Sequence, residues 1–224
     1  MRELASQHRR FGCPRIHWLL EREKLVVNYK RTERIYNEMN LQIRKRKGNK
    51  KTGNVIRLPL RQPRGPNEVW SMDFVFDRLE TGRNLKVFNV VDDYSKVIEG
   101  QIVDRSIRGT DLVRFFESLP TLPGFLRCDN GSEFWSSALQ NWAEGKVKFD
   151  FIEPGKPTQN AYVESFNGKF RDECLNEHQF FSILQAREII SEWRNHYHEG
   201  RPHQALGMKT PKEFASEQVI ELTS

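Results

Sequence analysis

Arg-Cys-Asp-Asn-Gly-Ser-Glu-Phe, residues 127–134, is the stretch around which the chain is organised. The apolar pair Phe125-Leu126 precedes it and an amphipathic segment starts at Ser132, so the pattern predicts a strand, a tight turn and a helix. Asp129 is then expected at the carboxyl end of a strand, where ligands and metal ions collect in open α/β sheets. A lone Asp-Asn-Gly more simply indicates a turn aspartate that bonds its own backbone. The rest of the chain must decide between the two interpretations.

Residues 69–103 carry the pattern of three antiparallel strands. Large apolar side chains occupy the even positions from Trp70 to Phe76, which leaves Asp73 in the middle of the strand on the opposite face. Residues 85–91 and 97–103 are also strand-like, and Asp92-Asp93-Tyr94-Ser95 separates them as a hairpin connection.

The remaining segments alternate between helical and strand patterns. In order we expect a helix over 110–119, the strand before Asp129, a helix over 132–145, a fifth strand over 147–152, helices over 160–175 and 183–196, and a proline-punctuated tail over 201–224. Asn160 is expected to cap the helix that follows it. Within that helix Glu164, Asn167 and Arg171 share a face that differs from the apolar stripe.

The positive charge of the chain lies at its N-terminal end. Residues 1–66 contain 18 Lys and Arg against 5 Asp and Glu, whereas residues 67–224 contain 18 against 25. Residues 11–41 read as two helices, the second capped by Asn28, which is the size of a helix-turn-helix unit. Its exposed face would present Lys30, Arg31 and Arg34 to DNA, although a helical hairpin with solvated basic residues gives the same pattern.

Four segments follow from these patterns: a basic helix-turn-helix-like unit over 1–42, a basic proline-containing linker over 43–67, a main domain over 68–200 and a tail over 201–224. The linker holds the charge block Arg44-Lys45-Arg46-Lys47 and three prolines, which disfavour helix and paired strand. A basic tether beside a basic helical unit is suited to following a phosphate backbone.

Composition and cysteine usage exclude several classes of protein. No apolar run approaches the roughly 20 residues of a membrane-spanning helix, and the N-terminus has no apolar stretch of signal-peptide type, so a cytoplasmic location is expected. Cys13, Cys128 and Cys174 are far apart and are expected to be reduced. His8 and His17 flank Cys13, but zinc requires about four ligands, so no zinc site is expected.

Three acidic residues stand out by position: Asp73 in the first strand, Asp129 at the end of the fourth and Glu164 early in the helix after the fifth. Carboxylates at three such places can hold one or two divalent ions, because Mg²⁺ prefers oxygen ligands. Two such ions would serve phosphodiester hydrolysis and transfer. The chain has 30 acidic residues, so other carboxylates could belong to such a site. The competitors are Asp77, Asp92, Asp93 and Glu133.

Five ordered motifs then carry a family resemblance. They are Trp70-Ser71-Met72-Asp73, the hairpin at 90–95, Cys128 to Phe134, Pro154-Gly155-Lys156-Pro157, and Asn160 to Phe166. Together they resemble the integrase-type catalytic core of bacterial insertion-sequence transposases, in particular the second-frame protein of copy-out, paste-in elements. The basic unit from Phe11 to Gln42 and the segment from Tyr197 to Leu206 also look like the corresponding parts of that family.

The resemblance implies an α/β fold of ribonuclease H-like type: a mixed five-stranded sheet flanked by helices, behind a small N-terminal helical domain. It implies a DDE-type transposase in which Asp73, Asp129 and Glu164 are the catalytic metal ligands for two Mg²⁺ or Mn²⁺ ions. DNA contacts are expected from the following basic and amide side chains: Lys30, Arg31, Arg34, Arg44, Lys45, Arg46, Lys47, Lys156, Asn160, Arg171 and Arg201.

The expected partners are the element ends, target DNA, further copies of the chain and the upstream-frame protein with which the family is normally fused; no membrane is expected. Two alternatives share many of these features. One is a DNA-binding regulator that has lost catalysis, and the other is a structure-specific nuclease without strand transfer.

Overall fold

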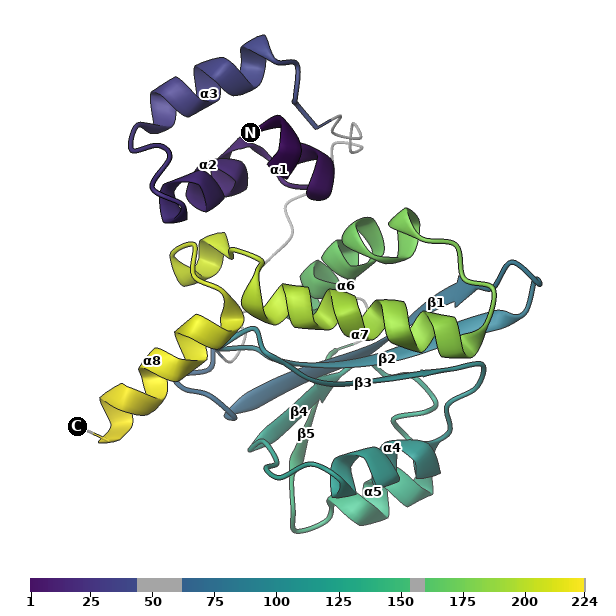
Figure 1. The fold of residues 1–224 in the computed structure, drawn as a ribbon. Coiled ribbons are helices and arrows are strands. Elements are labelled where there is room, and N and C mark those ends of the chain that lie inside the picture. Colours follow the sequence, from purple (N-terminus) through teal and green to yellow (C-terminus); the bar gives the residue numbers. More distant parts are fainter. Residues whose placement is uncertain (44–61, 154–159, 224) are drawn as a thin grey trace. The chain divides into compact units, whose positions relative to one another are not determined.

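The computed structural model describes residues 1–43, 62–153 and 160–223 (Figure 1). The chain forms two compact units, one made of residues 1–56 and 202–209 and the other of residues 57–201 and 210–224. Most of the expected linker, including Arg44 to Lys47, lies outside the described residues, and so does Lys156. Within the described ranges, no helix combines the length and apolar character that crossing a membrane requires.

The first unit contains the two expected helices and a further one. Its helices are α1 (Arg2–Gln7), α2 (Cys13–Arg22) and α3 (Tyr29–Glu38), with the short 3-10 turn η3 (Gln204–Leu206). Phe11, Ile16, Leu20 and Tyr36 form a small buried core. The predicted cap is confirmed, because the side chain of Asn28 accepts a hydrogen bond from the amide of Arg31 at 3.3 Å. The α1 helix buries no residue, which explains why apolar periodicity did not reveal it.

The second unit is built on a mixed five-stranded sheet, which confirms the predicted fold. Its strands are β1 (Val69–Arg78), β2 (Asn84–Asp92), β3 (Ile98–Asp104), β4 (Phe125–Cys128) and β5 (Lys148–Phe151), in the spatial order β3-β2-β1-β4-β5. The first three are antiparallel neighbours, whereas β4 lies parallel to both β1 and β5. The central strand β1 is therefore paired on both sides along its first residues, which makes it a rigid support for any side chain that it carries.

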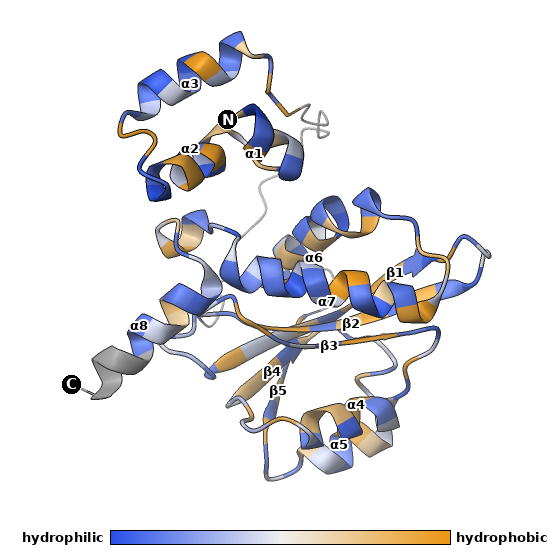
Figure 2. Ribbon diagram, in the orientation of Figure 1, coloured by the Kyte–Doolittle hydropathy of each residue, from blue (hydrophilic) through white to orange (hydrophobic). Residues whose placement is uncertain are grey.

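Helices cover both faces of this sheet (Figure 1). One face packs on α4 (Gly109–Glu117) and α5 (Ser137–Ala143) through a core that includes Trp70, Met72 and Phe88. The other packs on α6 (Ala161–Glu173), the short turn η2 (Leu175–Glu177) and α7 (Ile183–Glu199), around Val75 and Phe166. Hydrophobic residues concentrate along the central strands (Figure 2). The alternation in β1 thus places Asp73 on the face that carries α6.

Two elements differ from the expected ones. The helix expected from Ser132 begins only at Ser137, because the chain passes through turns over residues 132–135 first. The expected tail contains the helix α8 (Pro211–Thr223). Its start is a capping box, since the amide of Thr210 donates to Glu213 Oε2 at 2.9 Å and the amide of Glu213 donates to Thr210 Oγ1 at 3.3 Å. Pro211 occupies the first helical position, where proline is favoured, so here proline starts a helix.

Candidate active site

Asp73 projects from the centre of the sheet. Its carboxylate is half-buried, with Oδ1 accepting from the amide of Phe74 at 2.7 Å and Oδ2 from Asn167 Nδ2 at 2.8 Å. Each oxygen thus has one protein donor, and an ionised carboxylate can accept about two bonds per oxygen. Lone pairs remain on both oxygens for a further partner.

Asp129 lies directly after β4, as expected. Ser71 of β1 pairs with Arg127 of β4 in parallel register, so Asp73 and Asp129 both follow two residues later in the same direction. Oδ1 of Asp129 accepts from the amide of Gly131 at 2.9 Å. The local backbone cap is therefore real, and it occupies only one oxygen of a carboxylate that has two.

The third carboxylate, Glu164, is exposed in the first turn of α6. Burial raises the pKa of Asp73 to about 6, and the negative charges of Asp129 and Glu164 add to that rise. The three carboxylates therefore interact electrostatically, as the sequence pattern anticipated, although their assignment as metal ligands remains a prediction.

The donor set fits a hard divalent cation. Carboxylate oxygens are the ligands that Mg²⁺ and Mn²⁺ prefer, and a cation would offset both the burial and the neighbouring negative charges that raise the pKa of Asp73. Across the described residues, no three acidic, histidine or cysteine side chains already converge into a complete ligand cage. Since Glu164 is exposed at the start of its helix, its side chain can rotate without disturbing the core.

A hollow of about 300 Å³ lies beside this cluster. Asp73, Glu164, Asn167, Gly168 and Arg171 contribute to its lining. Arg171 Nη2 donates to the backbone oxygen of Phe76 at 3.1 Å, and the side chain is exposed. A carboxylate pair and an exposed guanidinium therefore border one small space, which is suited to a phosphate group with bound cations.

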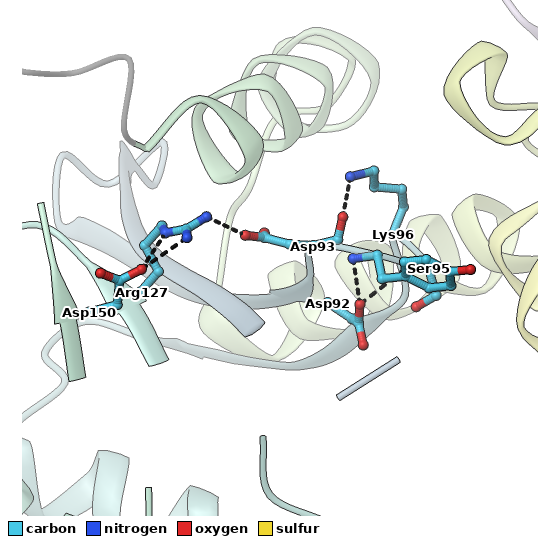
Figure 3. Close-up of polar contacts among 7 residues, drawn as sticks. Asp92, Asp93, Ser95, Lys96, Arg127 and Asp150 are labelled. Atoms are coloured by element: carbon cyan, nitrogen blue, oxygen red, sulfur yellow. Dashed lines mark hydrogen bonds and ion pairs between the residues drawn. The ribbon is translucent and has the colours of Figure 1, made fainter. Parts of the chain in front are cut away.

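The competing residues Asp92 and Asp93 have structural tasks (Figure 3). Oδ1 of Asp92 accepts from the amides of Tyr94 and Ser95 at 2.6 and 3.0 Å, so it closes the hairpin turn. Asp93 pairs at 2.9 Å with Arg127, which is 1% exposed and also contacts Asp150 at 2.9 Å. Lys96 donates to the backbone oxygen of Asp93. Asp92 thus stabilises the hairpin turn, and the Asp93 carboxylate connects it to Arg127 of β4.

The other two competitors are also accounted for. Glu133 forms an ion pair with Lys86, whose Nζ lies 4.0 Å from the ring centroid of Phe74. Oδ1 of Asp77 accepts from the amide of Arg78, its neighbour in β1. Asp92, Asp93 and Glu133 thus have side-chain or turn partners of their own, whereas the bond at Asp77 resembles those at Asp73 and Asp129, so the choice of Asp73, Asp129 and Glu164 stays a prediction.

The proposed DNA-contacting residues differ in accessibility. Lys30, Arg31 and Arg34 are exposed on α3, with Arg34 within 3.7 Å of Glu38 in a surface ion pair. Asn160 begins α6, but it makes no side-chain cap bond and is only 3% exposed, so the structure does not present its amide to DNA.

Arg201 requires a correction. The residue is fully buried, and its Nε and Nη2 each lie 2.6 Å from an oxygen of Glu173. Such a covered, bidentate ion pair leaves no face of the guanidinium for a phosphate, so Arg201 is a structural residue that connects the end of α7 to α6. A sequence pattern reveals the positive charge but not the acidic partner, which is 28 residues away.

Arg201→Met tests this correction through stability. The substitution removes the guanidinium from the largely covered Glu173 carboxylate, so we expect a loss of about 3–5 kcal/mol in the free energy of unfolding. Denaturant unfolding of the full chain measures it. An unchanged midpoint combined with weaker DNA binding would return Arg201 to the DNA-contacting set.

Asn167 is the site residue whose role sequence reasoning did not assign. Its position three residues after Glu164, on the same helix face, was visible in the sequence. What the sequence could not show is the direct contact with Asp73, because that contact depends on how α6 packs across β1.

Comparison with known proteins places the chain in a family. Two models described as "Integrase core domain" match residues 63–157 and 145–211, and one described as "HTH-like domain" matches residues 1–48. The chain is 48% identical to the insertion element IS407 31.7 kDa protein of Burkholderia multivorans, over 96% of this chain and 78% of that protein. It is 46% identical to the insertion element IS476 39.2 kDa protein of Xanthomonas euvesicatoria, over 96% of this chain and 63% of that protein.

Among solved structures, the HTLV-2 integrase catalytic core in complex with magnesium shares the fold, with a TM-score of 0.53 and 18% identity over 67% of this chain and 97% of that chain. Matches to integrase-core models, an N-terminal HTH-like domain and two insertion-element relatives agree with the mixed sheet and the N-terminal helical unit described above. The chain therefore belongs to the insertion-sequence transposases of the DDE superfamily, whose catalytic core is a polynucleotidyl transferase of the integrase type.

Proposed function

We propose that this transposase cuts a strand at each end of its insertion element and joins the freed 3′-hydroxyl to a second phosphodiester, with Asp73, Asp129 and Glu164 holding two divalent cations. In the first step water attacks the phosphodiester and the 3′-oxygen leaves. In the second step that 3′-hydroxyl attacks in line and another 3′-oxygen leaves, so each step exchanges one P–O bond for another.

A single observation supports the assignment most strongly. Asp73 is a half-buried carboxylate held by two hydrogen-bond donors, and its pKa is raised chiefly by burial, with a further contribution from the charges of Asp129 and Glu164. A bound pair of Mg²⁺ or Mn²⁺ ions would supply activation of the attacking oxygen and stabilisation of the leaving oxygen. The structure of the HTLV-2 integrase core was determined with magnesium, which is consistent with this choice of ion.

The other residues of the hollow would bind and orient the DNA. Arg171 can reach a phosphate next to the cut, because its guanidinium is exposed and lies on the Glu164 face of α6. Gly168 lies between Glu164 and Arg171 in the sequence of α6, and the space that a side chain would take at this position is open to at least 4 Å. A bare backbone in the middle of an exposed helix face lets the sugar-phosphate chain approach closely.

The N-terminal unit would bind DNA beside the core, with Lys30, Arg31 and Arg34 of α3 facing the phosphates or base edges. We further propose that the protein acts on bacterial DNA in the cytoplasm as a multimer assembled on two element ends, together with an upstream-frame product.

Strand-transfer assays on element-end oligonucleotides test the proposed reaction. With Mg²⁺ we expect both a nick at the element end and joined products, and with excess EDTA neither. Nicks without joined products would favour the structure-specific nuclease, and DNA binding without metal-dependent nicking would favour the silent regulator.

The contribution of α3 is testable through salt dependence. Replacing Lys30, Arg31 and Arg34 together by Gln removes three candidate phosphate contacts, so the slope of log affinity against log salt should fall by roughly 2–3. Titrations of duplex DNA at several salt concentrations measure it. A matched triple variant with Gln at the exposed residues Glu3, Glu21 and Glu23 should not reduce the slope. An unchanged slope in the basic variant would exclude α3 from the DNA contacts.

A further inference from the structure

A row of polar side chains crosses the face of the sheet beneath α6. Asp73 of β1 lies directly opposite Asn89 of β2, and Asn89 lies directly opposite Gln101 of β3. The next row on the same face is Val75, Val87 and Val103. Since Asn89 is fully buried, its amide would be costly without hydrogen-bond partners.

The partners form a continuous chain of amides. Gln101 Nε2 donates to Asn89 Oδ1 at 2.7 Å, and Asn89 Nδ2 donates to Asn167 Oδ1 at 2.9 Å. Asn167 Nδ2 then donates to Asp73 Oδ2 at 2.8 Å. The amide row thus connects β3, β2 and α6 to the Asp73 carboxylate on β1.

Chemistry gives this chain one direction. An ionised carboxylate only accepts hydrogen bonds, so Asn167 must turn its NH₂ group toward Asp73. The carbonyl of Asn167 then faces Asn89, which must present its own NH₂ group, and the carbonyl of Asn89 accepts from Gln101. Every amide orientation in the row is therefore determined by the carboxylate at its end.

The donors in this chain are neutral. A lysine or arginine in place of Asn167 would also hold Asp73, but its positive charge would oppose cation binding. An amide fixes the carboxylate and leaves its negative charge available. The chain also joins Asp73 to α6 only one turn from Glu164, which connects the placement of two proposed ligands that come from different elements.

We propose that Asn89 and Gln101, acting through Asn167, are positioning residues that hold the Asp73 carboxylate ready for a divalent cation. This inference rests on the proposed function, since it assumes that Asp73 is a metal ligand. It adds two residues on β2 and β3 that lie outside every motif of the sequence and outside the lining of the catalytic hollow.

Mn²⁺ binding to the full chain, measured by calorimetry without DNA, provides the test. Asn167→Leu removes the donor to Asp73, and Asn89→Leu removes the donor that orients the carbonyl of Asn167. We expect each to raise the Mn²⁺ dissociation constant roughly 10–100-fold, as is usual when a partner of a metal ligand is lost. Gln101→Met, at the half-buried end of the row, should raise it several-fold with little effect on folding.

The decisive readout is the double variant of Asn89→Leu and Asn167→Leu. If Asn89 acts only through Asn167, the double variant binds Mn²⁺ no more weakly than Asn167→Leu alone. A structural role for Asn89 would instead give additive effects or no effect on Mn²⁺. Val87→Ala, in the adjacent apolar row, is the matched control, because it destabilises the same strand without touching the chain and should leave the Mn²⁺ affinity unchanged.

Unchanged Mn²⁺ affinity in Gln101→Met and Asn89→Leu overturns the proposal, and so does additivity in the double variant. Failure of the proposed function looks different. If Asp73→Asn binds Mn²⁺ as tightly as the natural protein, Asp73 is not a metal ligand. The proposed function, on which the positioning role of the amides rests, is then wrong. If Mn²⁺ binds and the amide variants weaken it but no DNA is joined, the positioning role holds without strand transfer.

Discussion

Glu164→Gln is expected to abolish strand cleavage and strand transfer, with a loss of roughly 10³-fold or more, or about 4 kcal/mol of transition-state stabilisation. The substitution keeps the size of the side chain and removes one negative oxygen ligand from the proposed metal pair. Because Glu164 is exposed in the first turn of α6, folding should not change. Joined and nicked products on a donor-end oligonucleotide with Mg²⁺ measure the loss.

Asp172→Asn is the matched control for this experiment. Asp172 is exposed on the same helix, where it accepts a bond from Asn176 at 3.4 Å, so the same change in charge should leave activity within a few-fold of the natural chain. DNA affinity of Glu164→Gln should be retained, because the residue carries no phosphate contact. Undiminished transfer by Glu164→Gln would remove this residue from the mechanism.

The sequence was sufficient for the parts of the fold that depend on local pattern. Alternation in residues 70–76 placed Asp73 on the correct face of its strand, and the break after Cys128 placed Asp129 at a strand end. The i, i+3, i+7 spacing separated Glu164 and Arg171 from the packing side of α6. These features could be predicted because the apolar periodicity of a strand or helix, and the point at which it ends, depend on residues that are neighbours in the sequence.

Long-range partners were beyond sequence reasoning. Arg201 looked like a cation for DNA because Glu173, which neutralises it, lies on another helix. Asp93 looked like a possible ligand because its partner Arg127 lies on β4. The amide chain from Gln101 to Asn167 spans three elements, so no local window contains it. Helix α8 is a different case. Its capping box, Thr-Pro-Lys-Glu, is a local sequence signal, but the nearby prolines were interpreted as marks of an irregular tail.

Capping a turn and binding a metal ion are compatible roles for Asp129. One oxygen accepts from the amide of Gly131, and the same carboxylate contributes to the raised pKa of Asp73. A backbone bond to one oxygen fixes the orientation of the carboxylate and leaves lone pairs on both oxygens. In the proposed site the cap would hold the Asp129 carboxylate in place, as Asn167 would hold that of Asp73.

Asp73→Asn is expected to stabilise the metal-free protein while it eliminates catalysis. At pH 7.5 the natural chain must keep Asp73 ionised in surroundings that raise its pKa from 3.8 to about 6, which costs at most about 3 kcal/mol at roughly 1.4 kcal/mol per pKa unit. Asparagine avoids this cost but can accept only one of the two present hydrogen bonds, a loss of about 1 kcal/mol. The free energy of unfolding should therefore rise by about 1–2 kcal/mol, as measured by denaturant unfolding in EDTA.

The pH dependence of this difference identifies its cause. A carboxyl group whose folded-state pKa is raised contributes stability below its unfolded pKa, and that contribution is lost as pH rises through about 6. The advantage of Asp73→Asn should thus be present at pH 7.5 and disappear by pH 5, where Asp73 is protonated.

Mg²⁺ at pH 7.5 should raise the midpoint of the natural chain and not that of the variant, because only the natural site binds the cation. Asp77→Asn, on the same strand, should show neither effect. If Asp73→Asn is less stable than the natural chain at pH 7.5 and Mg²⁺ stabilises both equally, the carboxylates around Asp73 do not form the cation site.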